Sequence, residues 1–127
     1  MCGELQMAFI CFEDLRVFQL AEKLCDDIWE IVGGWNYFEK NTVGRQLVKA
    51  ADSIGANIAE GSGRGYPNDN KRFIKIARGS LNETKFWLRR ASKRGLLDQN
   101  QSECLAKTLD ELAPTLNAFL SSIGRNA

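Results

Sequence analysis

Apolar residues recur at steps of three and four positions through almost the whole chain, and this period constrains the fold more than any other feature. It matches the 3.6-residue turn of an α-helix, so each segment that carries it has one apolar face. Runs of β-branched residues are absent, and only two prolines occur. We therefore expect four helices, over about residues 12–32, 42–62, 68–94 and 99–123. Joined by short loops within one domain (residues 1–127), they predict an all-α, antiparallel, up-down-up-down four-helix bundle.

The first expected helix has a wide apolar arc. Val17, Leu20 and Leu24 broaden the arc beyond one core-facing stripe, and so does Ile31. An arc of this width implies burial on two sides, either from a central position or from a contact between subunits. The stripe itself consists of Leu15, Phe18, Ala21, Cys25, Ile28, Trp29 and Val32.

Three aromatic residues, Trp35, Tyr37 and Phe38, follow in the loop after this helix. They plug the open end of a bundle if they pack on its core. Alternatively, they form an exposed surface for stacking or docking.

The second expected helix combines an apolar stripe with many small residues. Small residues let neighbouring helices approach closely, and each glycine costs about 1 kcal/mol of helix propensity, so a packing contact should offset it. Ser53, Asn57 and Glu60 follow one another at steps of four and three and form a polar seam, which we interpret as a structural hydrogen-bond lock. The stripe consists of Val43, Leu47, Ala50, Ile54 and Ile58, and the small residues are Ala50, Ala51, Ser53, Gly55, Ala56, Ala59 and Gly61.

A glycine-rich corner, residues 61–65 (Gly-Ser-Gly-Arg-Gly), follows the second helix. No strand precedes it and no Lys-Ser/Thr pair follows, so it is not a phosphate-binding loop of the P-loop type. Its glycines end the helix and turn the chain. Arg64 can reach a carboxylate such as Glu60, or a phosphate.

The third expected helix starts near Pro67, ends before Gly95, and has one apolar and one strongly basic face. Phe86 is an outlier on the basic face: it stacks on an unpaired base, is buried against another subunit, or is an idle surface residue. A helical wheel places Phe73, Ile76, Ala77, Leu81, Thr84, Trp87, Leu88 and Ala91 on the apolar side, and Lys71, Lys75, Arg78, Lys85, Arg89 and Lys93 on the opposite side.

The net charge of +1 hides an uneven distribution of charge along the chain. Residues 1–63 hold five basic and ten acidic side chains, whereas residues 64–94 hold ten basic and two acidic ones. Residues 95–127 hold two basic and four acidic side chains. A basic segment of this kind indicates a contact with nucleic acid or with an acidic protein. The alternatives are a solvated helix face and a face paired with the acidic first helix.

The fourth expected helix keeps a near-heptad apolar rhythm. Pro114 removes one backbone hydrogen bond, but the apolar phase continues across it, so we expect one kinked helix rather than two. The apolar positions are Leu105, Leu109, Leu112, Leu116, Phe119, Leu120 and Ile123.

The four cysteines, Cys2, Cys11, Cys25 and Cys104, show neither a CxxC pair nor metal-ligand spacing. Cys11 and Cys25 would lie about 20 Å apart within one helix, too far for a bridge between them. We expect four reduced thiols, with Cys25 in the core, in a cytoplasmic protein. No stretch approaches the length of a membrane span.

Several blocks of sequence resemble one known family. They include Phe12–Phe18 (Phe-Glu-Asp-Leu-Arg-Val-Phe), Asn57–Gly61 (Asn-Ile-Ala-Glu-Gly) and Ala77–Ser80 (Ala-Arg-Gly-Ser). The chain resembles, over nearly its whole length, the bacterial four-helix-bundle family of 23S rRNA intervening-sequence proteins, often labelled S23 ribosomal proteins. Gly55 stands where many relatives have proline.

The segment Ala77–Leu97, with Glu83-Thr84, Trp87-Leu88 and Arg90-Ala91, is similar to one branch of that family. This branch is the accessory variability determinant of diversity-generating retroelements, a basic, barrel-like pentamer of four-helix bundles that binds nucleic acid and a reverse transcriptase. The likeness implies a ring-like homo-oligomer, a pentamer, with RNA or an RNA–DNA intermediate and a reverse transcriptase as partners.

We expect no catalytic activity, no cofactor and no metal, because the chain has no histidine and its cysteines have no base partner. The favoured function is binding of structured RNA or an RNA–DNA intermediate, with basic side chains on phosphates and Phe86 or Arg90 stacking. The alternative is a protein-interaction scaffold whose basic face serves subunit or partner contacts. The predicted nucleic-acid-binding residues are Arg64, Lys71, Lys75, Arg78, Lys85, Phe86, Arg89, Arg90, Lys93 and Arg94.

Overall fold

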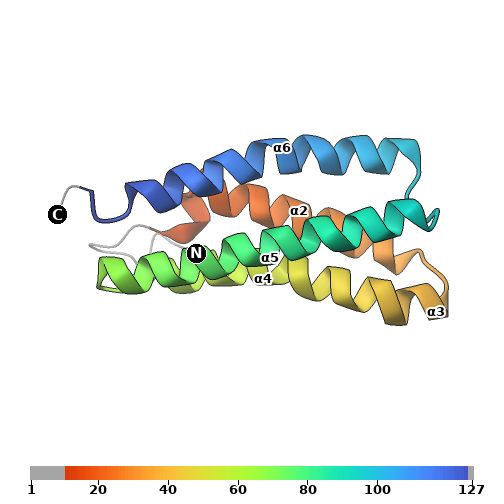
Figure 1. Cartoon of the computed structure of the whole chain (residues 1–127), viewed down its shortest axis with the longest axis horizontal. Coiled ribbons are helices and arrows are strands. Elements are labelled where there is room, and N and C mark those ends of the chain that lie inside the picture. Colours follow the sequence, from red (N-terminus) through yellow and green to blue (C-terminus); the bar gives the residue numbers. More distant parts are fainter. Residues whose placement is uncertain (1–10, 126–127) are drawn as a thin grey trace.

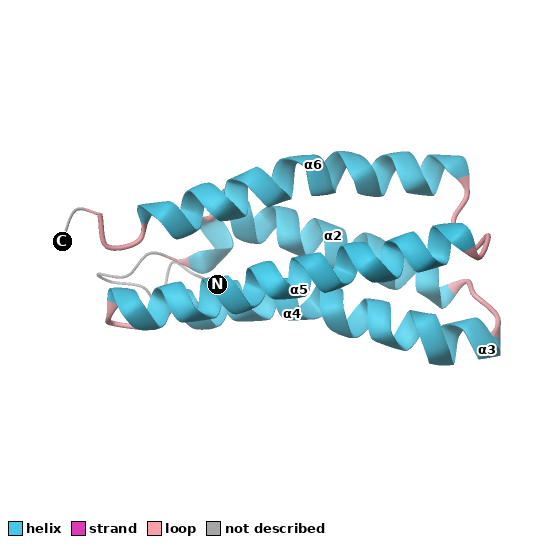
Figure 2. Ribbon diagram, in the orientation of Figure 1, coloured by secondary structure: helices cyan, strands magenta, loops and turns pink. Residues whose placement is uncertain are grey.

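The computed structural model describes residues 11–125, and within them the chain forms a bundle of long helices without a strand (Figures 1 and 2). The predicted all-helical bundle is confirmed. A short 3₁₀ turn precedes the first long helix, and a helical turn with a π segment leads into the second. In chain order the elements are η1 (Phe12–Asp14), α2 (Arg16–Gly33), α3 (Tyr37–Glu39), η2 (Lys40–Gly44), α4 (Arg45–Ser62), α5 (Pro67–Lys93) and α6 (Gln99–Ser122).

Each long helix packs against two others. Helix α2 lies against α4 and α6, and α5 lies against the same two helices. Helices α2 and α5 therefore occupy diagonal corners of the bundle. Short connections join successive helices at alternate ends, so the chain runs back and forth along the long axis (Figure 1). None of the described helices is long and apolar enough to cross a membrane.

The core-facing side of α2 differs in phase from the predicted stripe. Trp29 is exposed, because it lies three and seven positions from Asp26 and Glu22 on an outward ridge. Cys25, expected in the core, is only half-buried. The fully core-facing positions are Val17, Leu20, Ala21, Leu24, Ile28 and Val32.

Helix α4 buries its predicted stripe, and its small residues bring it close to α5. A Cβ atom added at Gly61 would lie 3.1 Å from the Cβ of Phe73 and 3.2 Å from the Cδ1 of Ile74. No larger residue fits there without displacing α5, which is the contact that offsets the low helix propensity of glycine. The buried stripe is Val43 of η2 followed by Leu47, Ala50, Ile54 and Ile58 of α4.

The expected loop after α2 is shorter than predicted, because the chain is already helical at Tyr37. Trp35 is half-buried, packs on the core, and donates its Nε1–H to the carbonyl oxygen of Leu96 at 3.1 Å. Tyr37 and Phe38, in contrast, are 83% and 71% exposed. The two interpretations of this aromatic cluster thus divide between its members: Trp35 closes the end of the bundle, and the other two face solvent.

Helix α6 begins with a capping box and remains one helix across Pro114. Asp98 accepts a hydrogen bond from the backbone N–H of Gln101, whose side chain accepts one from the N–H of Asp98. Leu105, Leu112 and Leu116 are buried, and the remaining predicted apolar positions pack partly buried against the core.

The expectation that all the cysteines are reduced thiols is wrong for Cys11, which is disulfide-bonded. The spacing argument excluded only a bridge between Cys11 and Cys25, and Cys25 is indeed free, as is Cys104. The expectation for Cys2 lies outside the described residues.

Candidate nucleic-acid interface

Helix α5 carries the predicted interface, and its ends follow the sequence signals. Pro67 occupies the first turn, and Gly95 adopts φ +74° just after the last turn, where the N–H of Leu96 bonds to the carbonyl of Ala91 at 2.9 Å. The core side is centred on the line from Ile74 through Leu81 to Leu88, and its buried residues are Ile74, Ala77, Leu81, Thr84, Leu88 and Ala91.

The placement of Ile76 in the core is wrong. Ile76 is 43% exposed, and Ile74 takes the core position instead. The helical wheel predicted an apolar face centred near Phe73 and Trp87, which are half-buried on the side toward α4. The observed core face is rotated about the helix axis from the predicted one by about half the angle between successive residues. Ile76 therefore joins Arg72, Phe86 and Arg90 on what we call the outer ridge of α5.

The strongest concentration of positive charge runs along α5 beside α6. The Arg78 guanidinium donates to the Oδ1 of Asn117 on α6 at 3.4 Å, and Arg89 borders a small hollow lined by Leu105 and Leu109 of α6. Lys75, Arg78, Lys85, Arg89 and Lys93 are exposed, and Lys71 is half-buried. We call these six residues the basic stripe: Lys71, Lys75, Arg78, Lys85, Arg89 and Lys93.

The basic stripe makes no ion pair with the described part of the chain. The pairs found there are Arg16–Glu111, Lys23–Asp27, Arg64–Glu60 and Arg72–Asp69. Helix α2, with exposed Glu22, Asp26 and Glu30, lies at the diagonal corner of the bundle. Internal neutralisation of the stripe by the acidic first helix of the same chain therefore does not occur, and the six side chains, five of them exposed, have no ion-pair partner among residues 11–125.

Phe86 lies on the outer ridge, 52% exposed. Its ring meets that of Trp87 edge-on, with centroids 5.0 Å apart, and the Arg90 guanidinium carbon lies 5.9 Å from its centroid. The Nε of Arg90 is buried and has no hydrogen-bond partner within residues 11–125. Phe86 thus keeps a free face beside a cation, an arrangement suited to a base or to another protein surface.

Arg64 is held at the beginning of α5 rather than along the stripe. It pairs with Glu60, and its guanidinium lies 4.7 Å from the ring centroid of Phe73, where Arg72 also approaches to 4.5 Å. Arg72 was absent from the predicted set, although its charge is visible in the sequence.

The predicted polar seam of α4 divides into two parts. Ser53 Oγ lies 2.8 Å from Ser80 Oγ of α5, and Asn57 donates to Ser53 Oγ at 3.0 Å. Thr84, buried in the same interface, donates to the carbonyl of Ser80 at 2.8 Å. Glu60 is exposed and takes no part in this network. Ser53 and Asn57 therefore join α4 to α5, whereas Glu60 forms an ion pair with Arg64.

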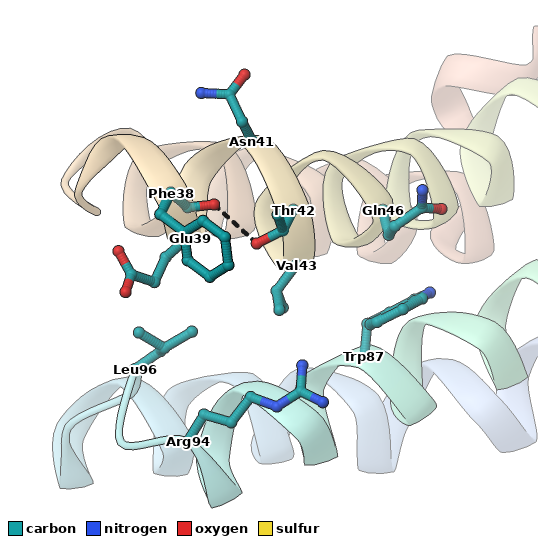
Figure 3. A pocket seen from close by; sticks show the side chains of 9 residues that line it. All are labelled: Phe38, Glu39, Asn41, Thr42, Val43, Gln46, Trp87, Arg94 and Leu96. Atoms are coloured by element: carbon teal, nitrogen blue, oxygen red, sulfur yellow. Dashed lines mark hydrogen bonds between the residues drawn. The ribbon is translucent and has the colours of Figure 1, made fainter.

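A groove lies at the end of the bundle, where α3 and η2 pass the end of α5 (Figure 3). It was not predicted from the sequence. Its volume is about 620 Å³. A signal existed: in a back-and-forth bundle, the loop after the first helix and the end of the third helix meet at the same end. We call this the end groove, lined by Phe38, Glu39, Asn41, Thr42, Val43, Gln46, Trp87, Arg94 and Leu96.

The fold and surface together define an all-helical bundle protein with one extended cationic face. The chain matches the model of the family described as 23S rRNA-intervening sequence protein over residues 13–118, and it belongs to that family. The resemblance predicted from the sequence blocks is thereby confirmed. No curated protein matches the chain.

A solved structure shares this fold. It is a crystal structure of a protein with unknown function from the S23 ribosomal protein family of Bacteroides thetaiotaomicron. The similarity has a TM-score of 0.73 at 22% sequence identity and covers 84% of this chain and 99% of the other. At this identity the likeness shows the common fold.

Proposed function

We propose that this chain is a non-catalytic nucleic-acid-binding protein that holds structured RNA, or an RNA–DNA intermediate, along the basic stripe of α5. The observation that carries the proposal is the set of six basic side chains without an ion pair in the described chain. A row of cations on one rigid helix matches the regular negative charge of a phosphate backbone. Contacts of this kind give affinity with little sequence preference.

Assembly into a ring-like homo-oligomer, a pentamer, belongs to the same proposal. A ring would repeat the basic stripe around its circumference and raise affinity through multivalency. The exposed apolar residues Ile76 and Phe86 on the outer ridge support a protein contact at this helix, because phosphate binding does not require them.

A second candidate follows from the same two residues: a scaffold that docks a partner protein, such as a reverse transcriptase, on the outer ridge of α5. Competition distinguishes the two functions, since nucleic acid should displace a partner that uses the same helix. A partner bound equally well with and without RNA would place its site elsewhere.

Charge reversal tests the main proposal. In the variant Lys75→Glu/Arg78→Glu/Arg89→Glu, three stripe cations become anions, and the affinity for a structured RNA should fall more than about tenfold at 0.1 M salt. The control is Lys40→Glu/Arg45→Glu/Lys49→Glu, which changes the net charge equally but alters a surface shared by α4 and α2. Equal losses in both variants, or no loss in the first, would contradict the proposal.

A further inference from the structure

The end groove has two walls that carry aromatic rings. Phe38 and Val43 come from the α3–η2 side, whereas Trp87 comes from α5 and Leu96 from the loop after it, so the two rings approach the space from opposite sides (Figure 3). Phe38 is 71% exposed and Trp87 is half-buried. A volume of about 620 Å³ lies within the range of sites that hold small ligands.

Unused polar groups accompany these rings. Arg94 makes no ion pair in the described chain, although Glu39 lines the same groove, and no hydrogen bond engages the Gln46 side chain there. The Thr42 hydroxyl already donates to the Phe38 carbonyl at 2.7 Å, and Asn41 points away from the space in Figure 3. Donors and acceptors are therefore available at Glu39, Gln46 and Arg94.

Cations also lie at the end of α5, where the groove opens. Arg90 and Lys93 lie in the last turn of α5, and Arg94 caps that helix at the mouth of the groove. Trp87 lies on the opposite side of α5 from the stripe, so a phosphate backbone that follows the stripe would reach the two rings by turning around the end of α5, past Lys93 and Arg94. An apolar peptide would use the rings but would leave these cations without counter-charges.

We propose that the end groove takes one unpaired nucleobase of a single-stranded or looped segment, stacked on Phe38 and Trp87, while the phosphates of that segment turn around the end of α5, past Arg94 and Lys93, to the basic stripe. The inference rests on the proposed nucleic-acid function and adds what the site prefers: unpaired over fully paired nucleic acid. Stacking on aromatic side chains is open to every base, and the Watson–Crick edge is free for Glu39, Gln46 and Arg94 only when the base is unpaired.

The test compares Phe38→Ala with Tyr37→Ala, its exposed neighbour outside the groove. The probes are an RNA hairpin with an unpaired loop and a blunt, fully paired RNA duplex with the same number of phosphates. Phe38→Ala should weaken binding of the hairpin about tenfold and leave duplex binding within about twofold, because only stacking is lost. Tyr37→Ala should leave both affinities unchanged. Both side chains are exposed, so both variants should fold, which circular dichroism checks.

The failures of the two proposals are distinguishable. If Phe38→Ala weakens both probes equally, or neither, the base site is overturned while stripe binding stands. If the unaltered protein binds neither probe at low salt, the nucleic-acid function and the base site are both overturned. An abasic substitution in the hairpin loop gives a second measurement: it should remove the difference between Phe38→Ala and the unaltered protein.

Discussion

The hydroxyl oxygens of Ser53 on α4 and Ser80 on α5 lie 2.8 Å apart and join the two helices across their interface. Asn57 donates to the same Ser53 oxygen at 3.0 Å, so one hydroxyl serves two partners. Because these groups are only partly exposed, water replaces a lost partner incompletely.

Ser80→Ala should therefore lower the free energy of unfolding by about 1 kcal/mol. The matched control is Ser92→Ala, on the exposed side of the same helix, which should change stability by less than about 0.5 kcal/mol. Urea denaturation measures both. A Ser80→Ala variant as stable as the control would show that the hydrogen bond contributes nothing.

Two glycines should respond to alanine in opposite directions. At Gly44 a Cβ atom would lie 2.7 Å from Val32 Cγ1 and 3.2 Å from the Glu39 carbonyl oxygen, whereas at Gly79 nothing lies within 4 Å. Gly44→Ala should destabilise the fold by about 1–3 kcal/mol through overpacking. Gly79→Ala should stabilise it by about 0.5–1 kcal/mol through helix propensity. Thermal or urea unfolding that gives the same sign for both would contradict this packing.

Cys25 and Cys104, the free cysteines of the described residues, should differ in reactivity. Burial raises the pKa of Cys25 to about 12, and the nearby carboxylates of Asp52 and Asp26 act in the same direction. At pH 8 its thiol stays protonated, so iodoacetamide should alkylate Cys25 at least about tenfold more slowly than exposed Cys104. Peptide mass spectrometry without reduction measures each site separately. Equal rates would show that Cys25 is not protected.

The same raised pKa predicts a loss of stability in alkali. The folded chain holds the Cys25 proton more tightly than the unfolded chain, so this contribution is complete below about pH 9, the ordinary thiol pKa, and is lost as pH rises toward 12. Unfolding free energies measured across this window should fall less steeply for Cys25→Ala than for the unaltered protein. Parallel curves would contradict the assigned cause.

The periodic positions of the sequence predicted the helices well, because one buried face fixes the phase of each long amphipathic segment. The buried stripe that runs from Val43 in η2 to Ile58 in α4 shows this. Which side of a helix faces the core is harder to predict where the apolar arc is wide or where aromatic residues flank it. Trp29 and Ile76 were placed in the core for that reason, although both point outward.

The site was only partly predictable. Charge counts and the helical wheel located the basic stripe. Its lack of ion-pair partners in the described chain was not predictable, because it depends on the diagonal positions of α2 and α5. The end groove joins Phe38 to Trp87 and Arg94, residues about 50 positions apart, so no local pattern contains it. Tertiary arrangement supplies these relationships, and a periodicity within one segment does not.

The most direct measurement is the affinity of the purified protein for a structured RNA across a salt series of about 50–300 mM, with the oligomeric mass recorded at each point. The account predicts that log affinity falls linearly with log salt, by about 0.7–0.9 per phosphate neutralised, while the mass stays constant. The Lys75→Glu/Arg78→Glu/Arg89→Glu variant should show a clearly shallower slope. No binding at the lowest salt would contradict the account and assign the basic stripe to contacts with a partner protein or another copy of the chain. A mass that falls as salt rises would also contradict it and assign the stripe to contacts between copies.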